Sequence, residues 1–212
     1  KAECEKRLPE IEFTESGASQ SGKSVGELSE AICRGYEALN EEYPELNLGS
    51  FSSRGKPVMA SRVMTALRTT GVYTYFTGES NVNVHYPDYT TPYTIAHEMA
   101  HQRGFAREDE ANFIAYMACL QSDNPLMAYS AYYTAFTYAM DELYYYDSIT
   151  WKIIMNAVDS GVRDDIEREH AYWKQFDTIS SEFTSSVNNT YLTIMDVQDG
   201  VQSYSRMVEL LL

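Results

Sequence analysis

The stretch "YTIAHEMAHQRGFAREDEANFIAY", residues 93–116, decides how this chain is interpreted. It places His97 and His101 four residues apart, with Glu98 directly after the first histidine. On a helix, side chains four residues apart project from one face, about one turn from each other. This spacing lets two imidazoles bind one zinc ion while the glutamate acts as a general base. The alternative is an ordinary amphipathic helix that carries two histidines and no metal.

A catalytic zinc site needs a third protein ligand, and the residues after Gly104 supply the candidates. Gly104 is expected to end the first helix and to let the chain turn back. In the metzincin pattern a third histidine stands where this chain has Arg107, and a guanidinium cannot bind zinc. The next residue, Glu108, can bind it. We therefore expect His97, His101 and Glu108 to hold a zinc ion (Zn2+).

The spacing on the second helix supports Glu108. Glu108 and Asn112 are four residues apart on one face, so Asn112 is expected to contact a residue that binds the metal. Asp109 and Glu110 are rivals for the ligand position. Asp109 should point about a quarter-turn away, and Glu110 should face solvent or Arg107. All three acids also suit the first turn of a helix without a metal, because they interact favourably with its dipole.

This set of residues predicts zinc-dependent hydrolysis. Two histidines and one carboxylate leave the fourth zinc position for water, and Glu98 would be the catalytic base that takes a proton from that water. The donor that stabilises the developing oxyanion stays open among Tyr132, Tyr133, His170, Tyr204 and Arg206.

Composition limits the fold and the partners. The 212 residues are 44% hydrophobic and include 18 tyrosines, which is enough for a folded domain with a core. The formal net charge is −15, which argues against nucleic acid as a partner and against docking on an anionic membrane surface. Cys4, Cys33 and Cys119 form no Cys-x-x-Cys pair, so a thiolate zinc site is not expected. Cys119 should lie in the core, whereas Cys4 and Cys33 could pair in an oxidising compartment.

The expected fold class is mainly α with a small β-hairpin or sheet. Residues 14–26 are rich in Ser and Gly and indicate a loop or linker. Ser24 and Glu27 fit a capping box at the start of a helix over residues 25–42. Helical patterns follow over residues 57–69, 91–103, 107–121, 126–146, 149–159, 163–195 and 200–212. The predicted architecture is an active-site helix, a short turn, a second helix that carries a ligand, and a helical C-terminal part.

Residues 72–87, "VYTYFTGESNVNVHYP", predict a hairpin with its turn at Gly78. In its second arm, residues 81–86, the valines and Tyr86 should form a packed face and the asparagines a polar face. We expect this arm to be an edge strand beside the histidine helix, where an extended peptide substrate can pair with it. His85 could face that cleft, but an exposed histidine without a role is the expected outcome.

The block from His97 to Tyr116 resembles gluzincin-type zinc peptidases, in which H-E-x-x-H is followed by a helix bearing E-x-x-A-[DN]-x-x-A. CAAX prenyl proteases and ImmA-like peptidases carry that second motif, which here comprises Glu108, Ala111, Asn112 and Ala115. More narrowly, residues 70–212 resemble a bacterial family of membrane-anchored zincin-like proteins catalogued as a domain of unknown function. The shared features are the metal block, Gly78, Glu79, Asn81, Val82 and Asn83, and a closing Gly200, Val201, Ser203 and Tyr204.

The resemblance implies transmembrane helices before Lys1 and a catalytic domain that lies outside the cytoplasm at the cell membrane. Residues 1–23 would then be a segment after the anchor, and residues 24–212 a single zincin-like metallopeptidase domain. The expected substrate is an extracytoplasmic peptide or protein, and the oligomeric state stays open. The gap between His101 and Glu108 is shorter than in well-studied gluzincins, which leaves the substrate type open.

Two other functions stay open. One is a non-catalytic binding or sensor domain that keeps zinc for structure, and the other is a zinc hydrolase of a non-peptide amide such as a cell-wall crosslink. Glu98 favours catalysis over the first of these, because a structural site has no use for a general base.

Overall fold

The computed structural model describes residues 1–7, 11–15, 17, 19–49 and 53–176 of the chain, and this part is mainly helical, as predicted. Its helices are α1 (Ala2–Arg7), α2 (Val25–Glu42), α3 (Ser61–Ala66), α4 (Thr91–Gln102), α5 (Glu108–Leu120), α6 (Pro125–Tyr146), α7 (Ser148–Asn156) and α8 (Ser160–Lys174). The short 3-10 helix η2 (Pro44–Leu46) follows α2, and the 3-10 helix η3 (Asp88–Thr90) directly precedes α4. None of the described helices combines the length and apolar character that a membrane span requires.

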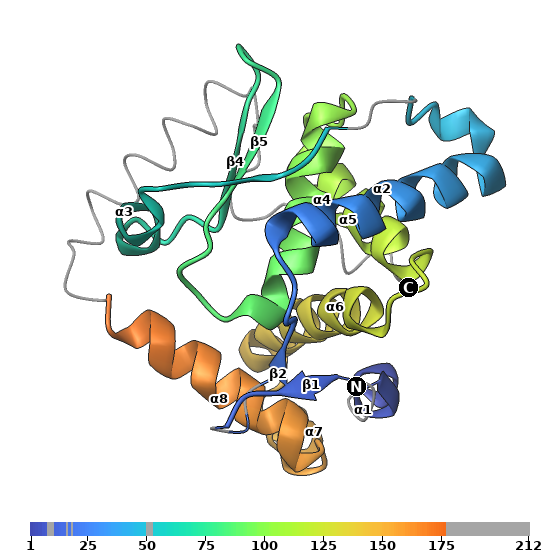
Figure 1. Ribbon diagram of the computed structural model, residues 1–212. Helices are drawn as coiled ribbons and strands as arrows, with labels where there is room; N and C mark the ends of the chain where they lie inside the picture. The colour runs from blue at the N-terminus through green and yellow to red at the C-terminus, as the bar shows by residue number, and fades with distance from the viewer. Residues whose placement is uncertain (8–10, 16, 18, 50–52, 177–212) are drawn as a thin grey trace.

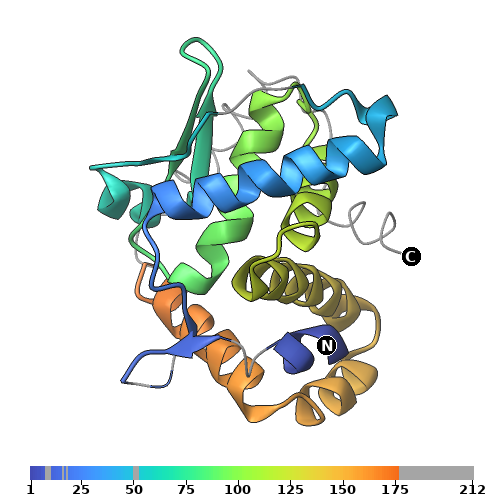
Figure 2. The same ribbon diagram turned by 45° about the vertical axis from the view of Figure 1, so that its right-hand side comes forward.

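Helix α2 confirms the predicted capping box. The Ser24 side chain accepts a hydrogen bond from the Glu27 backbone, and the Glu27 carboxylate accepts one from the Ser24 backbone. The helix crosses α4 and α5 (Figure 2), and the Tyr36 hydroxyl donates to the Ala96 carbonyl of α4 at 2.7 Å. Gly35 permits a close approach to α5, where a Cβ would meet the backbone carbonyl of Ala118. This packing holds α4 from one side.

The predicted hairpin is present, but its second arm is not an edge strand. Strands β4 (Gly71–Thr74) and β5 (Glu79–Val82) pair antiparallel around a turn with Gly78 at φ 67°. Strand β5 also pairs in parallel with β3 (Lys56–Pro57), so the strand order is β3-β5-β4. The outer strand of the hairpin is therefore β4, whose Gly71 and Tyr73 lie against Glu98 and His101 of α4, which corrects the prediction for residues 81–86.

The predicted alternation along residues 81–86 also fails after Val82. Asn83 is fully buried and Val84 is exposed, the reverse of the prediction. The Asn83 side chain explains this, because its amide donates to the Thr65 hydroxyl at 3.0 Å and its carbonyl oxygen accepts from the His85 backbone at 2.8 Å. An asparagine that bonds to nearby backbone competes with the strand ladder and ends it here.

The helix predicted over residues 57–69 is shorter than expected. Pro57 lies in β3, and α3 covers only Ser61–Ala66. The ladder continues past Pro57, because the Val58 backbone donates to the Val82 carbonyl at 3.0 Å. Proline is tolerated in β3 because this strand lies at the outer edge of its sheet.

Helices α6 and α8 form the other side of the fold (Figure 1) and share a buried polar cluster. Asp165 of α8 accepts hydrogen bonds from the Tyr129 hydroxyl of α6 at 2.5 Å and from the backbone and hydroxyl of Ser19 at 3.1 and 2.5 Å. Ser19 belongs to β2 (Ser19–Gln20), which pairs with β1 (Glu12–Phe13). This strand lies within the stretch 14–26 that was predicted to be a loop, and it ties the N-terminal region to α8.

The remaining helix predictions hold within the described residues. Helices α4 to α7 match the predicted ranges to within a few residues, and α8 occupies the start of the range 163–195. Residues 177–195 and the predicted helix 200–212 lie outside the described residues. Cys119 is fully buried, as predicted, and Cys4 and Cys33 are both free thiols.

Candidate metal centre

Helix α4 positions both histidines on one face. It begins with Thr91 and Pro92, and proline suits a first helical turn because its missing N–H has no partner there. The Nε2 atoms of His97 and His101 are 3.0 Å apart, and the two rings are perpendicular. His101 is buried, and the His97 side chain is 14% exposed. The predicted pairing of the two imidazoles is therefore present.

The turn at Gly104 returns the chain to these histidines. Gly104 has φ 99°, which favours glycine, and its N–H donates to the His101 carbonyl at 3.0 Å. Helix α5 then begins at Glu108. The Glu108 carboxylate oxygens lie 3.1 Å from His97 Nε2 and 3.4 Å from His101 Nε2. The three predicted ligands thus converge within the described structure.

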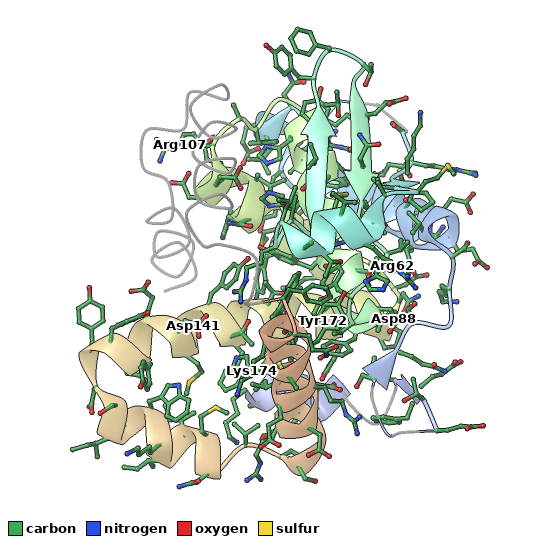
Figure 3. All side chains as sticks on the ribbon, turned by 90° about the vertical axis from the view of Figure 1, so that its left-hand side faces the viewer. Arg62, Asp88, Arg107, Asp141, Tyr172 and Lys174 are labelled. Atoms are coloured by element: carbon green, nitrogen blue, oxygen red, sulfur yellow. The ribbon has the colours of Figure 1, made fainter. Side chains whose placement is uncertain are left out.

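The two rival acids point elsewhere. Asp109 pairs with Arg107, whose Nε lies 3.1 Å from Asp109 Oδ1. Glu110 is exposed, and one of its oxygens is 3.6 Å from Arg107 Nε. Arg107 itself projects from the start of α5 at the outside of the molecule (Figure 3). Of the three neighbouring acids, Glu108 is the one that reaches both histidines.

A hydrogen bond from outside the trio orients the ring of His101. His101 Nδ1 donates to the Phe105 carbonyl at 2.7 Å, since a carbonyl can only accept. This bond places the ring proton on Nδ1 and leaves Nε2 free to bind a metal. Asn112 is buried and accepts from the Tyr93 hydroxyl at 3.2 Å. His97 Nδ1 and Asn112 Nδ2 have no well-formed hydrogen bond among the described residues.

Glu108 and His97 form an ion pair. Burial alone would lower the pKa of His97, but the hydrogen bond and the charge of Glu108, with a contribution from Glu98, raise it to about 9. Burial would raise the pKa of Glu108, but the neighbouring imidazoles of His101 and His97 hold it far below its ordinary range. Both effects favour the charged forms of the two partners.

The donor set fits zinc. One ligand atom from each of His97, His101 and Glu108 can be chosen so that all lie within 4.8 Å of one another. Zinc binds imidazole nitrogen at roughly 2.0–2.1 Å, which puts two tetrahedral ligands about 3.3 Å apart. The observed separation of the two Nε2 atoms, 3.0 Å, is close to this value. These three residues could therefore hold a metal ion, and two histidines with one carboxylate are a set known for catalytic zinc.

Glu98 lies on α4 next to the first ligand and is buried between α4 and the sheet. Its backbone carbonyl accepts a hydrogen bond from Ser80 Oγ at 2.9 Å. Its side chain is 5% exposed, the Tyr73 backbone N–H is a donor to it, and Oε2 has no partner among the described residues. Burial raises the pKa of Glu98, although the two histidines oppose this effect.

The candidates for the oxyanion donor are distributed over the molecule. The Tyr133 hydroxyl donates to Glu169 at 2.6 Å, and the ring of Tyr132 packs on Tyr116. His170 is exposed. Tyr204 and Arg206 lie outside the described residues. The Tyr133 hydroxyl therefore belongs to a contact between α6 and α8. None of these contacts assigns the oxyanion donor.

His85 is neither exposed nor without partners, in contrast to the expectation. Its Nδ1 lies 3.0 Å from the Tyr172 hydroxyl and 3.5 Å from the Thr65 hydroxyl. Figure 3 shows Tyr172 on α8 where this helix approaches the part of the chain that carries the sheet. His85 therefore belongs to a contact between α8 and the residues that follow β5.

Two residues near the site were not predicted from the sequence to lie there. Tyr73 of β4 stacks on the His101 ring with centroids 6.4 Å apart, and Gly71 lies against the Glu98 side chain. Tyr73 was assigned to the first arm of the hairpin over residues 72–87, and Gly71 lies directly before that range. The distance of either residue from α4 is not visible in a local pattern. The pairing of β5 with β3 makes β4 the outer strand of the hairpin, and no local pattern in the sequence indicates that pairing.

Comparisons with known proteins place the chain in a family. The model of the family described as "Protein of unknown function (DUF3810)" matches residues 2–212. The curated proteins and the solved structures contain no match. In this chain the group of His97, His101 and Glu108 could hold a metal ion. The family match covers this block and nearly the whole chain, so the chain belongs to the DUF3810 family.

Proposed function

We propose that this protein is a zinc-dependent metallopeptidase that hydrolyses peptide bonds in an extracytoplasmic peptide or protein. The observation that carries the proposal is the convergence of His97, His101 and Glu108 on one point, with the buried carboxylate of Glu98 on the adjacent position of α4. The location outside the cytoplasm, at a cell membrane, rests on the resemblance noted in the sequence and is part of the same proposal.

The chain's own residues suit the steps of hydrolysis. His97, His101 and Glu108 would hold the zinc ion, and the Phe105 carbonyl keeps His101 in the tautomer that binds it. When bound, zinc supplies Lewis acidity that polarises a carbonyl group and makes an attacking water more acidic. Glu98 would accept a proton from that water and return it to the leaving nitrogen. Burial raises the pKa of Glu98, which is the direction that a general base requires.

The edge of β4 is the proposed place for the substrate backbone. Asn83 donates to the Thr70 carbonyl at 2.8 Å, so Thr70 and every second residue after it turn their backbone groups toward β5. Gly71 and Tyr73 then turn theirs toward the other side of β4, where the Tyr73 N–H donates to the Glu98 side chain. An extended peptide can add to such an edge as a further strand, and the main-chain bonds hold it irrespective of its sequence.

The test compares Glu98→Gln with Glu110→Gln, the same chemical change on an exposed acid of α5 that pairs with Arg107. The probe is a library of internally quenched fluorescent peptides, measured with zinc and after chelation. We expect zinc-dependent cleavage by the wild type and the Glu110 variant. The Glu98 variant should bind zinc normally but turn over at least about 100-fold more slowly, the usual contribution of a general base.

Either of two results contradicts the proposal. One is stoichiometric zinc binding by the wild type with no cleavage of any library peptide, which favours the non-catalytic zinc domain. The other is cleavage that survives in the Glu98 variant, which would remove the proposed base from the reaction.

A further inference from the structure

We infer that Gly71 is a positioning residue for Glu98: the absence of a side chain at residue 71 creates the space in which the Glu98 carboxylate lies beside the histidines. This inference rests on the proposed function and deepens it. A Cβ at residue 71 would lie 2.6 Å from Cγ and 2.7 Å from Cδ of Glu98, and closer still to Oε1. Such distances are far below van der Waals contact, so either the strand or the glutamate would have to move.

The glycine is needed for space and not for backbone conformation. Gly78 and Gly104 have φ values of 67° and 99°, whereas the φ of Gly71 lies outside this positive range. An ordinary L-residue could therefore adopt the backbone of residue 71 without strain. Glycine weakens a strand, and within one it often marks a place where another group approaches closely. At Gly71 the approaching group is the side chain of Glu98.

Hydrogen bonds hold the backbone on both sides of this contact. Strand β4 is held by a four-residue register with β5, in which Gly71 pairs with Val82. On the other side, Glu98 lies between His97 and His101 on α4, and its carbonyl accepts from Ser80. The end of the Glu98 side chain is therefore the part that would yield. It would leave the N–H of Tyr73 and its place near the two ligands.

The inference predicts that the site can lose turnover without losing its metal. In Gly71→Ala, His97, His101 and Glu108 keep their contacts, because the new methyl group meets only Glu98 among the nearest atoms. Zinc affinity, measured by competition with a chromophoric chelator, should stay within about 3-fold of the wild type. The kcat for a cleaved library peptide should fall on the order of 100-fold, and KM should change less, because β4 keeps its backbone register with β5 while the base is displaced.

A stability cycle tests the contact independently of activity. The variants are Gly71→Ala, Glu98→Ala, the double variant, and Gly26→Ala as the matched control, whose Cβ would meet only the Ser24 hydroxyl at 3.8 Å. Gly71→Ala should lower the urea midpoint clearly when Glu98 is present and much less in the Glu98→Ala background, because the clash has been removed. Gly26→Ala should not lower it in either background.

The outcomes separate this inference from the proposed function. If the wild type cleaves no peptide, the hydrolase proposal fails, but coupling in the stability cycle still supports the contact. If Gly71→Ala alone fails to fold, the double variant is expected to fold. The inference is overturned if the double variant is as unstable as Gly71→Ala, or if Gly71→Ala retains the wild-type kcat.

Discussion

His97 should carry a proton at neutral pH when the protein holds no metal, and this prediction tests the ion pair at the centre of the site. With a pKa of about 9, roughly 99% of its imidazole is protonated at pH 7, against about a quarter at the ordinary pKa of about 6.5. Zinc binds neutral imidazole, so loading the metal at pH 7 must displace about one proton from His97. The ring signals of the metal-free protein, titrated by NMR, report this directly, and only four histidines have to be assigned.

The perturbation is Glu108→Gln, with Glu110→Gln as the control. The substitution removes the hydrogen-bonded charge that raises the pKa of His97 but keeps the burial that lowers it. We therefore expect the pKa of His97 to fall from about 9 to about 6.5 or below. The control acid is exposed and contacts Arg107, so it should leave His97 unchanged. The described pairing would be refuted if His97 titrated near pH 6.5 in the wild-type protein. It would also be refuted if Glu108→Gln left the pKa of His97 unchanged.

The raised pKa of His97 also makes the stability of the folded protein depend on pH in a defined direction. The pKa of His97 is higher in the folded protein than the value of about 6.5 expected after unfolding. The pairing with Glu108 therefore contributes its full stabilisation below about pH 6.5, and this contribution is lost as the pH rises through about 9. The urea midpoint of the metal-free protein should fall over that interval, and Glu108→Gln should lack this component of the decline.

Two further substitutions test the packing around the site. Gly35→Ala would place a methyl group 3.1 Å from the Ala118 carbonyl carbon and closer to its oxygen, so we expect a loss of about 1–3 kcal/mol in urea unfolding; a neutral result would mean that α2 and α5 can separate. Asp165→Ala would leave the buried hydroxyls of Tyr129 and Ser19 without their acceptor, at a cost of about 3 kcal/mol in the same assay. An unchanged midpoint for the second variant would show that the cluster carries no net stabilisation.

The helices and the metal trio could be predicted because their determinants are close together in the sequence. The cap at Ser24, the proline at residue 92 and the glycine at residue 104 each act on the few residues beside them. The trio spans only His97 to Glu108, so two helical periods and one turn define its geometry. Glu108 could be preferred over its neighbours because helical spacing alone separates their directions.

The sheet was predicted less well because its pairing is not local. Strand β3 pairs in parallel with β5 through residues more than twenty positions apart, and Pro57 was interpreted as a helix start because proline favours both a first helical turn and an outer strand. The burial of Asn83 likewise depends on Thr65, which only the folded chain brings near. One misplaced strand was enough to assign the free edge to β5 and not to β4.

The metal trio is defined by residues close together in the sequence, whereas the sheet depends on distant ones, and this contrast has a chemical consequence for the site. The residues that could bind a metal come from one continuous block, whereas the environment of Glu98 comes from Gly71, Tyr73 and Ser80 of the hairpin. A change in the hairpin can therefore alter the proposed base while the metal trio stays intact. Within this family, a chain that keeps the trio but carries a side chain at the position of Gly71 should bind zinc without turnover. Whether zinc binding and hydrolysis separate in this way depends on a contact that no local motif contains.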